Sequence, residues 1–215
     1  MSLRQIQRRS AALLRDGGLL QALRAELNHE LSSSPPQSQN HQVGSSVMGF
    51  KWEWDDPRAQ DVVLRRHGDA EGEEIAVSAM LGPLRFDGEH ALPRNARMKV
   101  CIKKTGLEPV FHFDCSIFRR QDEELVDGFG YGSSDFTVKG AYYHPSVDCL
   151  GVYKYRGPRF SSLDPQLQKA LKEYLVARGI GEELTHFLIE HLHRKEHGQY
   201  VNWLRTLEGA FAKDA

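Results

Sequence analysis

The chain has 215 residues, of which 40% are hydrophobic, 28 are basic and 29 are acidic, so its formal net charge is -1. This length predicts one domain with a tail, and the balanced charge argues against a general nucleic-acid binder and against a polyacidic solvating protein. Three cysteines are too few for a disulfide scaffold and indicate a reducing compartment, and no apolar run approaches the roughly 18 residues that a membrane span needs.

The amino terminus differs in composition from the rest of the chain. Residues 1–15 contain four arginines, and the first acidic residue is Asp16. Such an arginine-rich, acid-poor segment is typical of a mitochondrial or plastid transit peptide. An ordinary basic helix start and the mature arm of a longer precursor are the alternatives. We expect residues 1–16 to be a transit-peptide-like or disordered arm that precedes a single domain at 17–215.

The first periodic segment predicts a helix over residues 13–31. One face of this helix carries a stripe of four leucines at spacings of three and four, namely Leu20, Leu23, Leu27 and Leu31. Such a stripe must pack against another element. Residues 32–46 are polar and contain Pro35 and Pro36, and they predict a flexible linker within the domain.

The middle of the chain alternates apolar and polar residues with the period of a β-strand. Turn-forming residues bound each run, and no helix-length pattern separates the runs. Since parallel strands need long crossover connections, we expect an antiparallel meander. The seven predicted strands lie at residues 48–54, 61–66, 75–81, 98–103, 111–117, 136–138 and 142–155.

Helical periodicity returns after Pro158. Asp164 suits an N-cap and Pro165 the first helical position, and Gly179 suits the end of that helix. Its predicted buried stripe consists of Leu167, Ala170, Leu171, Tyr174 and Leu175. A second helix is predicted over residues 181–211, so the fold class is α+β.

One segment of the last helix matches a catalytic pattern. Residues 193–197 read His-Arg-Lys-Glu-His, which is the HxxEH pattern of inverted zinc metallopeptidases. Histidines four apart share a helix face and can bind one Zn²⁺, with the glutamate as general base. The usual third ligand lies several tens of residues downstream, and only 18 residues follow His197. A solvated helix face is therefore the preferred interpretation, and a zinc-dependent hydrolase is an alternative.

Two acidic runs and one basic run stand out among the charged residues. The acidic runs are candidates for docking partners, and they consist of Asp69, Glu71, Glu73 and Glu74 in one turn and of Asp122, Glu123, Glu124 and Asp127 in another. The basic run at 94–104 contains Arg94, Arg97, Lys99, Lys103 and Lys104. Contact of this strand with RNA phosphates is a second alternative function, whereas solubility alone is the simpler interpretation.

The carboxy-terminal third resembles the mitochondrial glycoprotein family, the family of the mitochondrial acidic matrix protein, and its plant members in particular. The resemblance is strong there, modest from about residue 18 onward, and supported by the run QDVVLRR at 60–66. The recurring residues are Leu163-Asp164 before a helix, Tyr174-Leu175, Arg178-Gly179-Ile180, Lys195-Glu196-His197, Tyr200, Trp203-Leu204 and Leu207, with Tyr155-Arg156-Gly157-Pro158 as in plant members.

The resemblance implies a strongly twisted seven-stranded antiparallel sheet, flanked by one N-terminal and two C-terminal helices, in a homotrimeric ring. It implies that the leucine stripe packs on the last helix, within or between subunits, through Tyr200, Trp203, Leu204 and Leu207. Family members are matrix adaptors or chaperone-like proteins linked to mitochondrial translation, RNA processing and respiratory-chain maintenance. We therefore expect a mitochondrial protein (a plastid is the alternative) with no catalytic residue, cofactor or metal. Typical members are strongly acidic, whereas this chain is nearly neutral.

Overall fold

A computed structural model describes residues 18–32, 46–67, 72–119, 134–145, 155 and 157–212. The chain divides into two compact units, one made of Met1–Asn40 with Lys195–Ala215 and one made of His41–Arg194. None of the described helices combines the length and the apolar character that a bilayer crossing requires.

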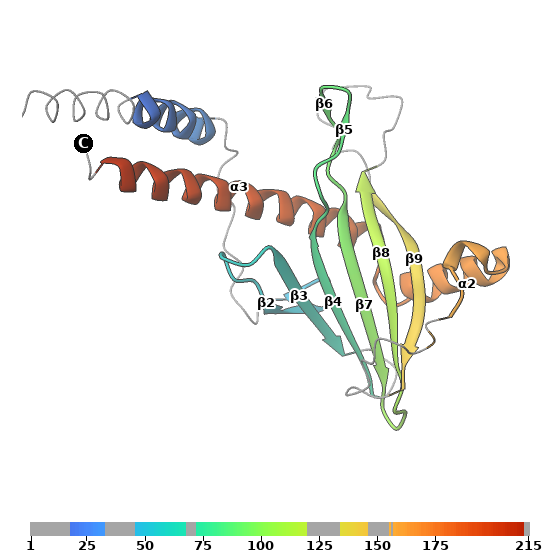
Figure 1. Cartoon of the computed structure of the whole chain (residues 1–215). Helices are drawn as coiled ribbons and strands as arrows, with labels where there is room; N and C mark the ends of the chain where they lie inside the picture. Colours follow the sequence, from blue (N-terminus) through green and yellow to red (C-terminus); the bar gives the residue numbers. More distant parts are fainter. Residues whose placement is uncertain are drawn as a thin grey trace, which may run out of the picture. The chain divides into compact units, whose positions relative to one another are not determined.

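The larger unit is built on a seven-stranded antiparallel sheet in the order β1-β2-β3-β4-β7-β8-β9 (Figure 1). Neighbours in the sheet are also neighbours along the chain, apart from a small β5–β6 hairpin inserted between β4 and β7, so the predicted meander is confirmed. The sheet is strongly twisted, and β2 crosses the direction of β8 in Figure 1. The strands are β1 (Ser46–Val47), β2 (Phe50–Trp54), β3 (Asp61–His67), β4 (Glu73–Leu81), β5 (Phe86–Asp87), β6 (His90–Ala91), β7 (Ala96–Lys104), β8 (Val110–Arg119) and β9 (Ser134–His144).

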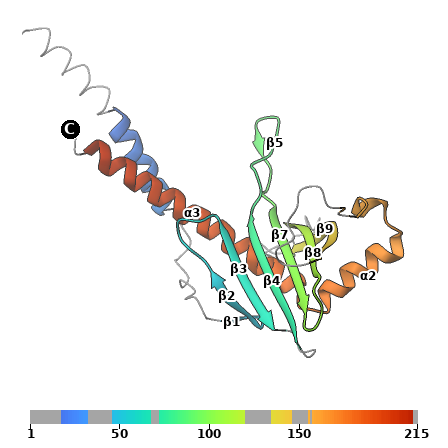
Figure 2. The ribbon, with the colours of Figure 1, turned by 60° about the horizontal axis from the view of Figure 1, so that its bottom comes forward.

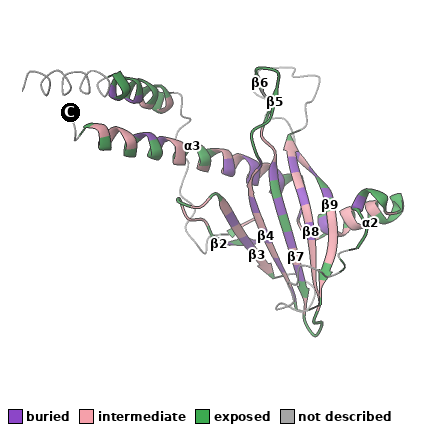
Figure 3. Cartoon of the chain, in the orientation of Figure 1, coloured by how far each residue is buried: buried purple, intermediate pink, exposed green. Residues whose placement is uncertain are grey.

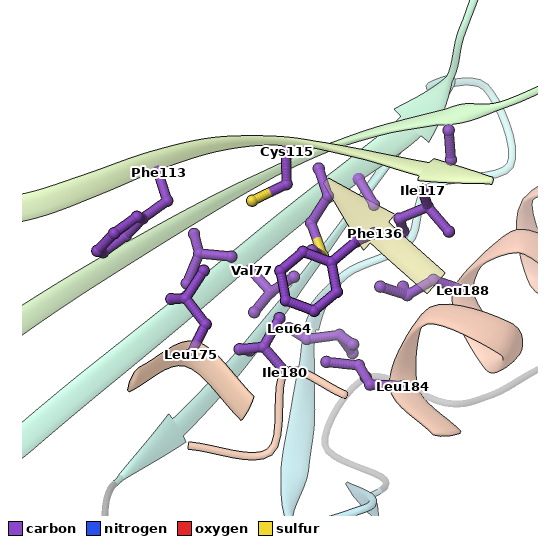
Figure 4. Close-up of a cluster of buried hydrophobic side chains, with 14 of the residues drawn as sticks. Leu64, Val77, Phe113, Cys115, Ile117, Phe136, Leu175, Ile180, Leu184 and Leu188 are labelled. Carbon is purple, nitrogen blue, oxygen red and sulfur yellow. The ribbon is translucent and has the colours of Figure 1, made fainter. Parts of the chain in front are cut away.

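Alternation along the strands separates a buried face from an accessible one. On β7, buried and exposed residues alternate from Ala96 to Val100, as the colours of Figure 3 show. The buried face packs against α2 (Pro165–Val176) and the first turns of α3 (Glu182–Ala212), where Leu175, Leu184 and Leu188 point at the sheet side chains in Figure 4. This apolar layer is the core of the larger unit, because all of these side chains are removed from water.

Local capping signals fix the start of α2. The Asp164 side chain accepts hydrogen bonds from the backbone N–H of Gln166 at 2.8 Å and of Leu167 at 3.3 Å, and Pro165 occupies the first helical position. The predicted buried stripe of this helix is only partly right. Leu175 is fully buried, whereas Leu167 and Ala170 are exposed, because only the C-terminal half of α2 contributes to the core.

Two strand predictions need correction. Met48 does not start a strand, since Met48 and Gly49 form the turn between β1 and β2 with φ values of 52° and 80°. The strands predicted at 136–138 and from Tyr142 onward are one strand, β9. Its register shifts opposite Asp114 and Cys115, and this bulge interrupts the alternation that the sequence shows. Residues 146–154 of the second predicted segment, like most of the 32–46 linker, lie outside the described residues.

The smaller unit pairs the N-terminal helix, residues 18–32, with the last turns of α3, and the two run side by side in both views (Figures 1 and 2). Leu20, Leu23, Val201 and Leu204 are its buried apolar residues. Polar contacts also join the helices. Arg24 pairs with Glu208 at 2.8 Å, Tyr200 Oη donates to Glu26 at 3.0 Å, and His197 Nδ1 lies 3.1 Å from Glu30.

Candidate docking surface

The first acidic run lies at the turn between β3 and β4. Asp69 and Glu71 fall outside the described residues, while Glu73 and Glu74 are the first two residues of β4. Because side chains alternate along a strand, these two glutamates point to opposite faces of the sheet. They therefore have different surroundings and different roles.

Glu73 is used inside the fold. Its side chain is 7% exposed and accepts hydrogen bonds from Nε and Nη2 of Arg178, both at 3.0 Å. The Arg178 guanidinium lies 3.5 Å from the centre of the Tyr174 ring and also donates to the Tyr174 carbonyl at 3.0 Å. Burial raises the pKa of Tyr174. Glu73 thus joins β4 to the end of α2 and is not accessible to a docking partner.

Glu74 lies on the accessible face and shares Arg65 of β3 with Glu53 of β2. Arg65 donates to Glu53 through Nη2 at 2.7 Å and through Nε at 2.8 Å, and it donates to Glu74 through Nη1. The hydrogen bond from Arg65 lowers the pKa of Glu53, and the bond to Glu53 raises the pKa of Arg65. Glu74 remains over one-third exposed, so its carboxylate is still accessible from solvent.

The second acidic run lies between β8 and β9, and all four of its residues (Asp122, Glu123, Glu124 and Asp127) fall outside the described residues. Arg119, the last residue of β8, pairs with Glu190 of α3. The end of β8 from which this run departs is therefore held to α3.

The histidines of the HxxEH pattern lie on α3 with different partners. Burial lowers the pKa of His193, and His197 pairs with Glu30 in the smaller unit. Within the described ranges, no group of three or more His, Cys, Asp or Glu side chains is placed to hold a metal ion. A zinc hydrolase needs three protein ligands around its metal, and the described residues do not bring three such side chains together.

Some residues of the basic run make contacts within the fold, and the others are exposed on the sheet. Arg94 donates to the carbonyl of Gly82 through Nε at 3.1 Å and Nη2 at 2.9 Å, which closes the base of the β5–β6 hairpin. Lys104 lies 3.9 Å from Glu73. The side chains of Arg97, Lys99 and Lys103 are exposed at alternate positions of β7, so these three share the accessible face of the sheet.

Sequence reasoning missed a polar cluster on β8 and β9. His112 Nδ1 lies 3.2 Å from His144 Nε2, and His112 Nε2 lies 3.2 Å from Asp114 Oδ1. Tyr142 donates to the other Asp114 oxygen, Oδ2. Burial lowers the pKa of His112, while Asp114 opposes this shift. The alternating polar residues of these strands were the signal for the cluster, but only the register brings His112 opposite Tyr142.

A second, largely buried histidine lies on α3 and pairs with an acid that follows β2. His191 Nε2 lies 2.9 Å from Asp55 Oδ2, and both side chains are 13% exposed. The His191 ring stacks on Phe187 at 5.9 Å and lies 4.8 Å from the Trp52 ring. The partly exposed pair of Lys172 and Asp135 at 3.0 Å likewise joins a helix to the sheet.

The eight predicted helix-packing residues all lie in the smaller unit. Leu20, Leu23 and Leu204 are buried, while Leu27, Leu207 and Tyr200 are partly buried. Leu31 and Trp203 are 44% and 55% exposed, and the Trp203 ring stacks on Tyr200 at 6.0 Å. The predicted stripe therefore has an inner part that packs within the chain and two apolar residues that the chain leaves accessible.

Sequence comparison identifies relatives of mitochondrial origin. The family model described as "Mitochondrial glycoprotein" matches residues 87–211. An uncharacterised mitochondrial protein of Arabidopsis thaliana is 28% identical over 203 residues, which cover 88% of this chain and 72% of that protein. The mitochondrial acidic protein mam33 of Schizosaccharomyces pombe is 32% identical over 82 residues, which cover 34% of this chain and 30% of that protein.

Two solved structures share the fold. A Leishmania major protein, described as a sequence homologue of human p32, is 19% identical with a TM-score of 0.63, and the Trypanosoma brucei p22 protein is 20% identical with a TM-score of 0.62. Each alignment covers 92% of this chain and 99% of the other chain. The predicted sheet and its three flanking helices are thus confirmed as a known architecture.

Proposed function

Because the chain belongs to the mitochondrial glycoprotein family, we propose that it is a non-enzymatic adaptor or chaperone-like protein of the mitochondrial matrix. It assembles as a homotrimeric ring and docks other proteins on that ring. Its partners come from mitochondrial translation, RNA processing or respiratory-chain maintenance, the processes with which the family resemblance associates it. The family match over residues 87–211 is the observation that carries this proposal.

The smaller unit supports self-assembly. Leu19, Leu31 and Trp203 are more than 40% exposed although they lie on the helices that carry the buried leucines. Large apolar side chains beside a packed helix pair are the composition expected at an interface between subunits. In a trimer each docking loop is present three times on one particle, so weak sites act together through a high effective concentration.

Ion pairs between the sheet and the helices support a structural rather than a catalytic role for several ionisable groups. Glu73 with Arg178, Asp55 with His191 and Lys172 with Asp135 each join a sheet strand or its flanking loop to a helix. Their charges stabilise the scaffold. The acidic residues that remain for docking are Asp69, Glu71, Glu74 and the run at 122–127. Because the net charge of the whole chain is only -1, negative potential is limited to these short segments.

The oligomeric state is the first test. Light scattering behind a sizing column should give a mass of about three times 24.4 kDa. A monomer at all protein concentrations contradicts the trimeric ring and with it the multivalent mechanism.

Partner docking is tested on the trimer. Cross-linked partners are captured from mitochondrial lysate with the wild type and with a variant carrying Asp122→Asn, Glu123→Gln, Glu124→Gln and Asp127→Asn. The control variant removes four exposed acids elsewhere, through Asp87→Asn, Glu89→Gln, Glu108→Gln and Glu183→Gln. Loss of partners with the first variant alone supports docking at this run, and equal capture by both variants contradicts it.

A further inference from the structure

The polar cluster on β8 and β9, the last two strands in the order of the sheet, brings two imidazole rings together. His112 of β8 lies opposite Tyr142 of β9, and His144 follows two residues later on the same side of β9. Nδ1 of His112 lies 3.2 Å from Nε2 of His144. The His112 side chain is 14% exposed and His144 is partly buried. Both rings therefore remain within reach of ions in solution.

The neighbouring carboxylate decides which nitrogen of His112 carries the proton. Nε2 of His112 lies 3.2 Å from Oδ1 of Asp114, and an ionised carboxylate can only accept a hydrogen bond. The proton of the neutral ring therefore lies on Nε2, and Nδ1 presents its lone pair toward His144. Metal-binding histidines have this arrangement, because the ring nitrogen that does not bind the metal usually donates to a carboxylate, a carbonyl or water.

A further layer of contacts holds the carboxylate in place. Tyr142 donates to Oδ2 of Asp114, and its ring centre lies 4.7 Å from that of His112. Gly140 lies opposite Asp114, and a Cβ added to Gly140 would lie 3.0 Å from Cε1 of Tyr142. The glycine thus leaves the room in which the Tyr142 ring reaches Asp114. Asp114 and Tyr142 together orient the His112 ring.

The spacing of the two facing nitrogen atoms matches that of two ligands on one ion. Two nitrogens bound to a tetrahedral Zn²⁺ at about 2.0–2.1 Å lie about 3.3 Å apart, close to the 3.2 Å between His112 and His144. We propose that Nδ1 of His112 and Nε2 of His144 bind one divalent late transition-metal ion, of the class of Zn²⁺ and Cu²⁺, for which imidazole is a suitable ligand. In the ion-free protein Nε2 of His144 donates to Nδ1 of His112. When the ion binds, this proton passes to solvent and the His144 ring takes up a proton at Nδ1.

The protein supplies two donors to the ion and leaves its other positions open. Among the residues that the structure describes, no third His, Cys, Asp or Glu side chain completes a metal-binding group. Water or a donor atom of a bound molecule therefore fills the remaining positions. The site shares no residue with the HxxEH pattern at 193–197 or with the acidic docking segments, so it and the proposed function can fail independently.

Isothermal titration calorimetry of the full chain, freed of metal with a chelator, is the first test. Zn²⁺ and Cu²⁺ should both bind, and Cu²⁺ more tightly, as the Irving–Williams order requires. Mg²⁺ should not bind, because it prefers oxygen ligands in octahedral geometry. Electron paramagnetic resonance of the Cu²⁺ form should show coupling to imidazole nitrogen. Absence of Zn²⁺ and Cu²⁺ binding, or equal binding of Mg²⁺, overturns the proposal.

Variants at the two ligands locate the ion. His112→Gln and His144→Gln should each bind one ion per chain fewer than the wild type. The control His90→Gln, which removes an exposed histidine of β6, should keep the stoichiometry of the wild type. Circular dichroism spectra check that all variants fold. If the ion is lost in His193→Gln with His197→Gln but kept in the two ligand variants, it binds the HxxEH pattern and the assignment to β8 and β9 is wrong.

The positioning role of Asp114 has its own readout. Asp114→Asn should keep the stoichiometry and weaken Zn²⁺ binding about tenfold, as expected for the partner of a metal-binding histidine. An ion that binds only the folded chain raises its Tm, so Zn²⁺ should stabilise the wild type and, at higher concentration, Asp114→Asn. It should not stabilise His144→Gln to the same extent. Equal Tm increases in the wild type and His144→Gln contradict the site, and unchanged affinity in Asp114→Asn contradicts the orienting role of the carboxylate.

Discussion

Arg178, in the turn after α2, holds the Glu73 carboxylate of β4 with two hydrogen bonds of 3.0 Å, although 105 residues separate them. This bidentate pair is a strong polar link between the helices and the sheet, because both partners are charged and largely removed from water. It places α2 over the end of the strand from which the first acidic run departs. The link between the helices and the sheet therefore includes a residue of the first acidic run.

Glu73→Ala should destabilise the chain strongly. Removing one partner of a buried pair leaves an uncompensated charge and costs about 3 kcal/mol or somewhat more. At about 2–4 °C per kcal/mol for a chain of this size, the Tm should fall by about 6–12 °C. Circular dichroism melts measure this, with the exposed Glu108→Ala as control. In a double-mutant cycle, Arg178→Ala should add little to Glu73→Ala, and full additivity would show that the two side chains do not interact.

Stability should fall between about pH 7.5 and about pH 5.5 through His112. Burial lowers its pKa below the unfolded value of 6.5, so the unfolded chain binds the proton more readily. The stabilisation is complete above pH 6.5 and is lost as the pH falls toward the folded pKa of His112. Burial also lowers the pKa of His193. The hydrogen bond from Arg65 lowers the pKa of Glu53 below its ordinary 4.5, so this carboxylate titrates outside the window.

Urea denaturation at the two pH values measures the effect of His112. His112→Gln should reduce the loss of stability on acidification, because the variant has no imidazole to protonate. The exposed His90→Gln should show the same loss as the wild type. An unchanged pH dependence in the His112 variant would mean that this ring does not couple protonation to folding.

The two described cysteines should differ in reactivity. Cys115 lies in the core, where burial raises the pKa of its thiol to about 12, so at about pH 8 only about one molecule in ten thousand carries the thiolate. Cys101 is half-buried and its pKa is raised less. In a Cys149→Ser background, iodoacetamide should label Cys101 first and Cys115 only after unfolding, as peptide mass spectrometry can show. Labelling of Cys115 in the native protein would contradict its burial.

The N-cap of α2 offers a smaller and more local effect. Asp164→Ala removes the acceptor of two backbone N–H groups and should cost about 1 kcal/mol. Asp164→Asn should keep most of the stability, because an asparagine oxygen caps equally well. Chemical denaturation compares the two variants. A loss of equal size in both would assign the effect to the charge rather than to the cap.

The features that the sequence predicts here are those encoded locally. Asp164 and Pro165 are adjacent and together predict the start of a helix, and the alternation from Met98 to Ile102 predicts a strand. Pairs that depend on register or on distant segments carried no such signal. From its sequence neighbours alone, Glu73 is predicted to be one of several exposed acids, because its partner Arg178 lies far away along the chain. The bulge in β9 concealed one strand as two, because it breaks the period of two on which the prediction rests.

Trp203 and Leu204 give the last test, because neighbouring positions on α3 face opposite surroundings. Leu204 is 2% exposed and Trp203 is 55% exposed. Leu204→Ala should cost about 2–5 kcal/mol through the cavity that it leaves and should increase hydrogen exchange in residues 18–32. Trp203→Ala should leave the monomer stability almost unchanged. If the Trp203 ring packs between subunits, this variant should instead lower the mass measured by light scattering at micromolar concentration. A trimer of unchanged mass and stability in the Trp203 variant would remove this residue from the proposed interface.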